Sequence, residues 1–178
     1  LMDERALAGH SGDKWFASHP PEAVAFPRST KAVSQILQFA NKHKIPLTAR
    51  GAGYGYVGGC VPVRGGIALS LKKMNRIREV SEDDFVAVVQ PGVITAALQN
   101  AVEAKRLYYP PDPASRSDCS IGGNIATNAG GVNVLRYGMM RNLVLGLEVV
   151  TADGMVLTSM NQMLKNNAGY DIKQLFIG

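Results

Sequence analysis

Two glycine-rich segments carry the residues of this chain best suited to chemistry. The first has the sequence RGAGYGYVGG and runs from Arg50 to Gly59, and the second runs from Pro111 to Gly131. Glycine lets consecutive backbone N–H groups turn toward one point without side chains in the way, and such concave arrangements bind phosphate oxygens. Each segment therefore indicates an anion site.

The first segment contains a dinucleotide-binding pattern in the wrong setting. Gly53, Gly55 and Gly58 match G-x-G-x-x-G, but in the Rossmann fold a helix begins inside that motif. Pro62 and the pair at 65–66 forbid a helix here and favour a turn into another strand. We interpret the segment as a phosphate loop of a different kind, and a glycine-rich turn without a ligand is the alternative.

The second segment combines a Pro-Asp-Pro triplet at 111–113 with a run of small residues from Cys119 to Gly131. Ser120 can cap a helix whose first amides, at Gly122 and Gly123, would point at an anion with help from the helix dipole. Close helix packing without a ligand is the alternative. Two separate phosphate cradles in a domain this small favour one cofactor that contains a diphosphate.

Composition narrows the class of protein. The chain has 178 residues, of which 46% are hydrophobic and 19% charged, so it can bury a core and is not a disordered protein. The net charge is +5, and its cations are scattered without an aromatic stacking surface, which favours a solvated surface over nucleic-acid binding. Cys60 and Cys119 are too few for a disulfide scaffold and lack ligand-spaced neighbours, so we expect a reducing compartment and no metal. No apolar stretch reaches the roughly 20 residues of a transmembrane helix, so we expect a soluble, cytoplasmic protein.

The elements that position these segments follow from periodicity and from proline and glycine. Residues 1–22 read as an N-terminal extension that is irregular or helical at its start and ends at Pro20-Pro21, after which the organised domain begins. We predict helices over 30–43 and 94–105, and strands over 23–26, 47–50, 66–71, 74–80, 85–90, 143–151 and 155–158. The strands at 23–26 and 47–50 would form a parallel pair, and Asp153-Gly154 would turn a hairpin. The order gives a mixed α+β domain that is parallel early and antiparallel late.

At this point the motifs resemble a known family, the FAD-binding domain of the vanillyl-alcohol oxidase (PCMH-type) superfamily. Within it they are similar to the FAD-linked 2-hydroxy-acid dehydrogenases, such as the FAD subunit of glycolate oxidase and D-lactate dehydrogenases. The resemblance rests on RGAG at 50–53, the glycine pair at 58–59, PDP at 111–113, CSIGGN at 119–124, NAGG at 128–131 and Tyr137-Gly138. It implies two α+β lobes, a small parallel β-α-β lobe over about 23–80 and a larger mixed or antiparallel lobe over about 81–178, with FAD between them.

The same resemblance implies the residues that contact FAD. Residues of the first glycine-rich segment, the first group, would bind the diphosphate. Residues of the second segment together with Tyr137, the second group, would line the diphosphate, the ribityl chain and the flavin. In relatives with a covalent flavin a loop histidine stands where this chain has Tyr54, so the resemblance implies non-covalent FAD. The first group is Arg50, Gly51, Ala52, Gly53, Tyr54, Gly55, Gly58 and Gly59, and the second is Pro111, Asp112, Ser117, Gly122, Gly123, Asn124, Ala126, Thr127, Asn128, Gly130, Gly131 and Tyr137.

The implied function is hydride transfer to FAD from a small 2-hydroxy acid of the glycolate or D-lactate type, with electrons passed on to another acceptor. The chain resembles a fragment truncated at its C-terminus, so we expect the catalytic residues and a cap domain to lie outside it, and weak or no FAD retention by the 178 residues alone. His10, His19 and His43 are expected at the surface. Partner subunits and peripheral membrane association through them are further implications. The alternatives are a reductase of the enolpyruvyl-sugar type and a non-enzymatic nucleotide-binding module.

Overall fold

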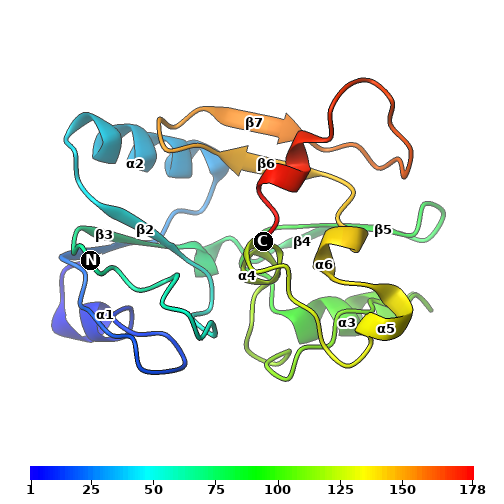
Figure 1. Cartoon of the computed structure of the whole chain (residues 1–178), viewed down its shortest axis with the longest axis horizontal. Helices are drawn as coiled ribbons and strands as arrows, with labels where there is room; N and C mark the ends of the chain where they lie inside the picture. Colours follow the sequence, from blue (N-terminus) through cyan, green and yellow to red (C-terminus); the bar gives the residue numbers. More distant parts are fainter. The chain divides into compact units, whose positions relative to one another are not determined.

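Two units make up the chain, and the computed structural model describes all of residues 1–178 (Figure 1). The first unit contains Leu1–Asn75 and Val150–Val156, and the second contains Arg76–Val149 and Leu157–Gly178. The second unit thus begins slightly before residue 81, where the second lobe was expected. Residues 1–22 lie within the first unit.

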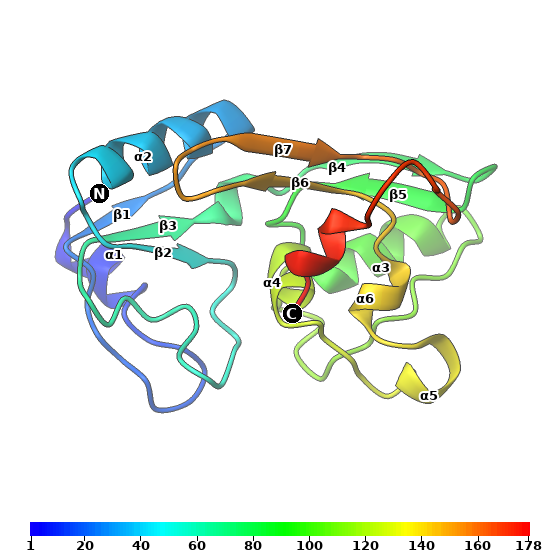
Figure 2. The same cartoon turned by 45° about the horizontal axis from the view of Figure 1, so that its top comes forward.

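The first unit is built on a three-stranded parallel sheet. Its strands are β1 (Ala23–Ala25), β2 (Leu47–Arg50) and β3 (Ile67–Ser70), in the order β1-β3-β2. Helix α2 (Thr30–Lys42) lies on one side of this sheet and α1 (Glu4–Ala8) on the other (Figures 1 and 2). A single 3-10 turn follows β3 at Leu71–Lys73.

The predicted pairing of the first two strands is wrong in one respect. Both strands are parallel, as predicted, but β3 lies between β1 and β2, and each of them pairs with β3. Strand β3 takes the centre because Ala68, Leu69 and Ser70 are all buried, whereas a strand at the sheet edge can leave side chains in water.

Helix α2 forms as its sequence indicates. Ser29 caps it, because its Oγ accepts a hydrogen bond from the Ala32 amide (3.2 Å), and the helix ends at Lys42, ahead of Pro46. Its buried residues Val33 and Ala40 lie on one face. Val33 joins Leu69 and other apolar residues in the core of the first unit, namely Met74, Ala25, Ile36, Leu37, Leu47, Leu71 and Val150.

The second unit is built on a hairpin and short helices. Strands β4 (Ile77–Ser81) and β5 (Val86–Val89) are antiparallel, and α3 (Thr95–Glu103) follows them. The shorter helices are α4 (Ile121–Ala126), α5 (Val134–Tyr137) and α6 (Met140–Leu143), and a 3-10 turn spans Ile172–Leu175. The buried core of this unit contains Val93, Leu98, Val102, Ile121, Met140, Val144 and Ile177.

A second hairpin joins β6 (Leu147–Val150) to β7 (Val156–Ser159). The predicted turn at Asp153-Gly154 is confirmed, and the Thr151 amide closes it with a hydrogen bond to the Met155 carbonyl (2.9 Å). The first strand is shorter than predicted, because Leu143 belongs to α6 and residues 144–146 belong to no helix or strand. The α+β class is confirmed, with a parallel sheet early and antiparallel pairing later. None of the helices is both long and apolar enough to cross a membrane.

His10 corrects the prediction that all three histidines lie at the surface. Its side chain is only 7% exposed, its ring meets that of Phe26 edge-on (5.2 Å between centroids), and its Nδ1–H donates to the Ala6 carbonyl (2.8 Å). The segment around it was predicted to be irregular or helical, and the helical alternative is confirmed by α1, but no pattern there indicated burial of His10. His19 and His43 are exposed, as predicted.

We expect His10 to make the stability of the fold depend on pH. Burial lowers its pKa below the ordinary value, and the nearby cations Lys72 and Arg50 act in the same direction. A histidine with a lower pKa when folded contributes its full stability above its unfolded pKa of about 6.5, and that stability is lost as the pH falls through the folded pKa. Urea denaturation between about pH 7.5 and 5 should show the free energy of unfolding falling. The free energy of unfolding should fall less with pH in His10→Gln than in the natural protein, and by the same amount as in the natural protein in the exposed control His19→Gln. The same dependence on pH in all three proteins would contradict this role of His10.

Candidate functional site

The glycine loop, residues 51–59, begins where strand β2 ends. No helix follows it, as predicted: residues 51–66 contain neither helix nor strand. Gly53 has a φ of +83°, and a Cβ there would collide with the guanidinium of Arg50. Only glycine suits that position, because it tolerates a positive φ and leaves room for the arginine.

Arg50 joins the two ends of the glycine loop through hydrogen bonds to Cys60. It is 9% exposed, and its Nη1 donates to the carbonyl oxygen and the Sγ of Cys60, both at 3.4 Å. The guanidinium thus connects the start of the loop to the residue that follows it. Direct contact between Arg50 and a cofactor stays a prediction.

Several loop amides are free to bind a ligand. The backbone N–H groups of Gly51, Ala52, Gly53 and Gly55 donate no hydrogen bond to the rest of the chain. At Gly55 and Gly59 no atom lies within 4 Å of the place where a Cβ would stand, so the backbone there borders open space. Unpaired amides beside open space have the properties of an anion-binding loop.

The amide of Gly58 is already paired within the chain, so its predicted contact with the diphosphate would have to use other backbone atoms and stays a prediction. It donates to the Oδ2 of Asp13 (2.9 Å), and the carbonyl of Gly55 accepts from the amide of Lys14 (3.1 Å). Sequence reasoning missed Asp13 and Lys14, because both lie in the segment predicted to be an N-terminal extension. The one signal there was Gly12-Asp13, a pair typical of turns.

At the start of α4 in the second unit, both amides that were predicted to face an anion donate within the chain. Ser120 does cap the helix, and its Oγ accepts from the Gly123 amide (3.4 Å), but the Gly122 amide donates to the carbonyl of Pro91 (2.8 Å). A Cβ on Gly122 would come within 2.6 Å of the Pro91 Cβ. Close packing, the alternative interpretation, explains Gly122, and neither predicted amide is free for a phosphate.

Two predicted asparagines of this region make hydrogen bonds within the chain. Asn124 is buried and its Nδ2 donates to Thr95 Oγ1 (2.7 Å). Asn128 has a φ of +48°, and its Oδ1 accepts from the Arg141 amide (2.8 Å). A ligand could reach the exposed Ser117, Ala126, Thr127 and Gly131, whereas Gly130 is half-buried.

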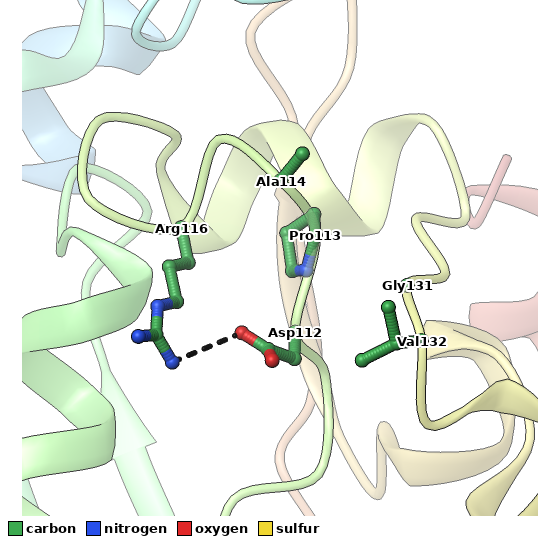
Figure 3. Close-up of a pocket in the computed structure, with 6 residues that line it drawn as sticks. All are labelled: Asp112, Pro113, Ala114, Arg116, Gly131 and Val132. Atoms are coloured by element: carbon green, nitrogen blue, oxygen red, sulfur yellow. Dashed lines mark hydrogen bonds and ion pairs between the residues drawn. The ribbon is translucent and has the colours of Figure 1, made fainter.

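An open pocket of about 450 Å³ lies beside the Pro-Asp-Pro triplet (Figure 3). Its lining includes Asp112 and Gly131, both predicted, and Arg116, which sequence reasoning did not single out. Nη1 of Arg116 pairs with Oδ1 of Asp112 at 3.2 Å, and Pro113, Ala114 and Val132 complete the lining. The pocket is therefore mostly apolar with one ion pair.

Two more predicted residues lie outside that lining. The buried Pro111 accepts a hydrogen bond from Gln99 Nε2 through its carbonyl (3.0 Å). The ring of Tyr137 lies 5.5 Å from that of Tyr108 and beneath the guanidinium of Arg136. The glycine loop belongs to the first unit and the pocket to the second, so binding of one shared ligand stays a prediction.

Comparison with known proteins decides the family. Residues 21–159 match the FAD binding domain family. The chain belongs to this family. It is 46% identical to the glycolate oxidase subunit GlcD of Bacillus subtilis over 158 residues, which are 89% of the chain and 34% of that protein.

Other relatives and solved structures agree with this assignment. The chain is 46% identical over its whole length to 39% of the D-2-hydroxyglutarate dehydrogenase of Stutzerimonas stutzeri, and 44% identical over 87% of its length to 34% of the D-lactate dehydrogenase of Archaeoglobus fulgidus. The fold matches an alkyldihydroxyacetonephosphate synthase with a TM-score of 0.88 at 23% identity, over the whole chain and 34% of that structure. It also matches 6-hydroxy-D-nicotine oxidase of Arthrobacter nicotinovorans with a TM-score of 0.74 at 22% identity, over 88% of the chain and 34% of that structure. This FAD-binding domain thus spans between a third and two fifths of these proteins.

The glycine loop fits the cofactor of the family. The free amides of Gly51, Ala52, Gly53 and Gly55, with the open space at Gly55 and Gly59, suit the diphosphate of FAD, because phosphate oxygens accept hydrogen bonds from such groups. The mostly apolar pocket in the second unit suits an aromatic group better than a phosphate. Diphosphate binding by the glycine loop stays a prediction that these free amides support.

We expect Gly55→Ala to weaken nucleotide binding and leave the fold intact. The added methyl meets no atom of the protein and φ at Gly55 is not positive, so stability should not change. A methyl group pushed against a bound phosphate should cost about 1 to 3 kcal/mol, or about fivefold or more in affinity for ADP measured by calorimetry. Gly9→Ala, at the C-cap of α1, makes the same change away from the loop and serves as the control. Equal ADP affinity in all three proteins would remove Gly55 from the site.

Proposed function

We propose that this FAD-binding domain belongs to a flavoprotein that oxidises a small 2-hydroxy acid to a 2-oxo acid. The names of its relatives carry the proposal. Glycolate, D-lactate and D-2-hydroxyglutarate, which stand in the names of three relatives at 44% to 46% identity, all bear a hydroxyl on the carbon next to a carboxylate. The three molecules differ only in what else that carbon carries, so the shared chemistry is more secure than any one of them.

Bound FAD would supply the chemistry by accepting a hydride from the hydroxyl-bearing carbon while the hydroxyl loses its proton, after which the electrons leave for a second acceptor. The chain's own part is to hold the cofactor. The free amides of the glycine loop would donate to the diphosphate, and Arg50 would keep that loop in place through Cys60. Because Tyr54 takes the loop position of a flavin-linking histidine, we propose that FAD is bound non-covalently.

The distribution of charge favours diphosphate binding by the first unit. That unit has ten Lys and Arg residues against five Asp and Glu, whereas the second unit has nine of each. The whole net charge of +5 therefore belongs to the unit that carries the glycine loop. A net positive charge on that unit raises the local concentration of an anionic ligand and speeds its association.

We assign no acid–base role to the histidines of this chain. His10 is packed against Phe26, and His19 and His43 are exposed. The groups that take the hydroxyl proton and bind the substrate carboxylate would lie outside these 178 residues, in a cap domain. The electron acceptor, partner subunits and a cytoplasmic or peripheral membrane location belong to the same proposal; GlcD of Bacillus subtilis is itself named a subunit.

The test uses the natural protein in full. Purified under mild conditions, it should carry flavin that is released on denaturation, and without oxygen one of glycolate, D-lactate and D-2-hydroxyglutarate should bleach its visible absorbance with formation of the matching 2-oxo acid. L-lactate serves as the stereochemical control.

Two other outcomes would replace the proposal. Bleaching by a reduced nicotinamide and reoxidation by an enolpyruvyl sugar, with no response to hydroxy acids, would favour the reductase alternative. Binding of ADP without retention of any flavin would favour a non-enzymatic nucleotide-binding module.

A further inference from the structure

Residues 11–19, here called the N-terminal loop, form a closed turn around the carboxylate of Asp13. Gly12 and Ser18 form an antiparallel bridge, the Asp13 amide donates to the Ala17 carbonyl (3.1 Å), and the His19 amide donates to the Ser11 carbonyl (2.9 Å). Oδ1 of Asp13 accepts from the amide of Trp15 (2.8 Å). The carboxylate is therefore held in one orientation by its own loop.

The other carboxylate oxygen of Asp13 reaches the glycine loop. Oδ2 accepts from the Gly58 amide at 2.9 Å, across 45 residues of sequence. Beside it the Lys14 amide donates to the Gly55 carbonyl (3.1 Å), and the Lys14 ammonium lies 5.1 Å from the centre of the Tyr54 ring. The N-terminal loop thus holds the glycine loop at Gly55 and Gly58 and leaves the amides before Tyr54 free.

These contacts address a weakness of any glycine-rich loop. Glycine loses more conformational freedom on ordering than other residues, so a loop with five of them is costly to fix at the moment a ligand binds. A loop that is already ordered binds its ligand more tightly, because it loses little conformational entropy when the ligand binds. A hydrogen bond from an amide to a carboxylate is among the stronger ones available for this purpose.

We propose that Asp13 is a positioning residue of the cofactor site, which holds the glycine loop ready for the diphosphate by binding the Gly58 amide. This inference rests on the proposed function. It goes beyond the family match, which begins at residue 21 and leaves the N-terminal loop outside.

The carboxylate has a second possible effect of opposite sign. A negative charge beside the loop repels a diphosphate, so removal of the charge alone would strengthen binding. Asp13→Asn separates the two effects, because its side-chain oxygen can still accept one of the two hydrogen bonds but carries no charge. If Asp13 acts by positioning the loop, Asp13→Asn should bind ADP more weakly than the natural protein does and more tightly than Asp13→Ala does.

The first measurement needs no cofactor. In the natural full-length protein freed of flavin, amide hydrogen exchange should quicken at 55–59 in Asp13→Ala. The matched control is Asp3→Ala, which also removes a carboxylate that accepts one backbone amide, that of Ala6, but caps α1 instead of contacting the glycine loop. Unchanged exchange at 55–59 in Asp13→Ala would overturn the proposal.

The second measurement links the contact to the ligand. Asp13→Ala should lose about tenfold in affinity for ADP, the size expected for one charge-assisted hydrogen bond, while its affinity for riboflavin, which has no phosphate, stays the same. A purely structural role would lower both affinities or only the melting temperature. Unchanged ADP affinity in Asp13→Ala, or tighter binding by Asp13→Asn, would overturn the proposal.

The two measurements also separate this inference from the proposed function. If the natural protein binds neither FAD nor ADP, the proposed function fails, even where the exchange experiment finds Asp13 holding the loop. If the natural protein binds both nucleotides and Asp13→Ala binds them equally well, the proposed function stands and the role of Asp13 fails.

Discussion

The structure depends on a loop that leaves its backbone amides without partners. Buried or half-buried N–H groups are normally paired, yet those of Gly51, Ala52, Gly53 and Gly55 have no acceptor in the chain. Such a loop keeps its shape only if its surroundings fix it. Here Arg50 supports it from beneath, and strand β3, which begins soon after the loop, pairs with the strand that precedes it.

Some backbone amides of the glycine-rich segments form hydrogen bonds within the chain, and others are left free for a ligand. Gly58 donates to Asp13 and Gly122 donates to Pro91, so the amides of these two glycines hold the fold. In the second unit, Asn124 and Asn128 make hydrogen bonds within the chain, and the pocket beside Asp112 stays open. A glycine-rich motif therefore contains residues of two kinds, and only hydrogen-bond partners distinguish them.

Sequence reasoning succeeded where a signal is local. Ser29 and Pro46 mark the ends of α2, and Asp153-Gly154 marks a turn. It failed where the partner is distant. The position of β3 between β1 and β2, the burial of His10 and the contact between Asp13 and Gly58 all depend on residues far along the chain, which no local pattern encodes. The family resemblance supplied the cofactor, whereas the choice of which amides could reach it required the structure.

The central claim is that the amides of the glycine loop bind a diphosphate, and amide hydrogen exchange during a nucleotide titration tests it most directly. ADP should slow exchange at 51–55 in the flavin-free protein, and adenosine at the same concentration should not, because it lacks the phosphates. Binding of ADP with unchanged exchange at 51–55 would contradict the account and place the diphosphate elsewhere.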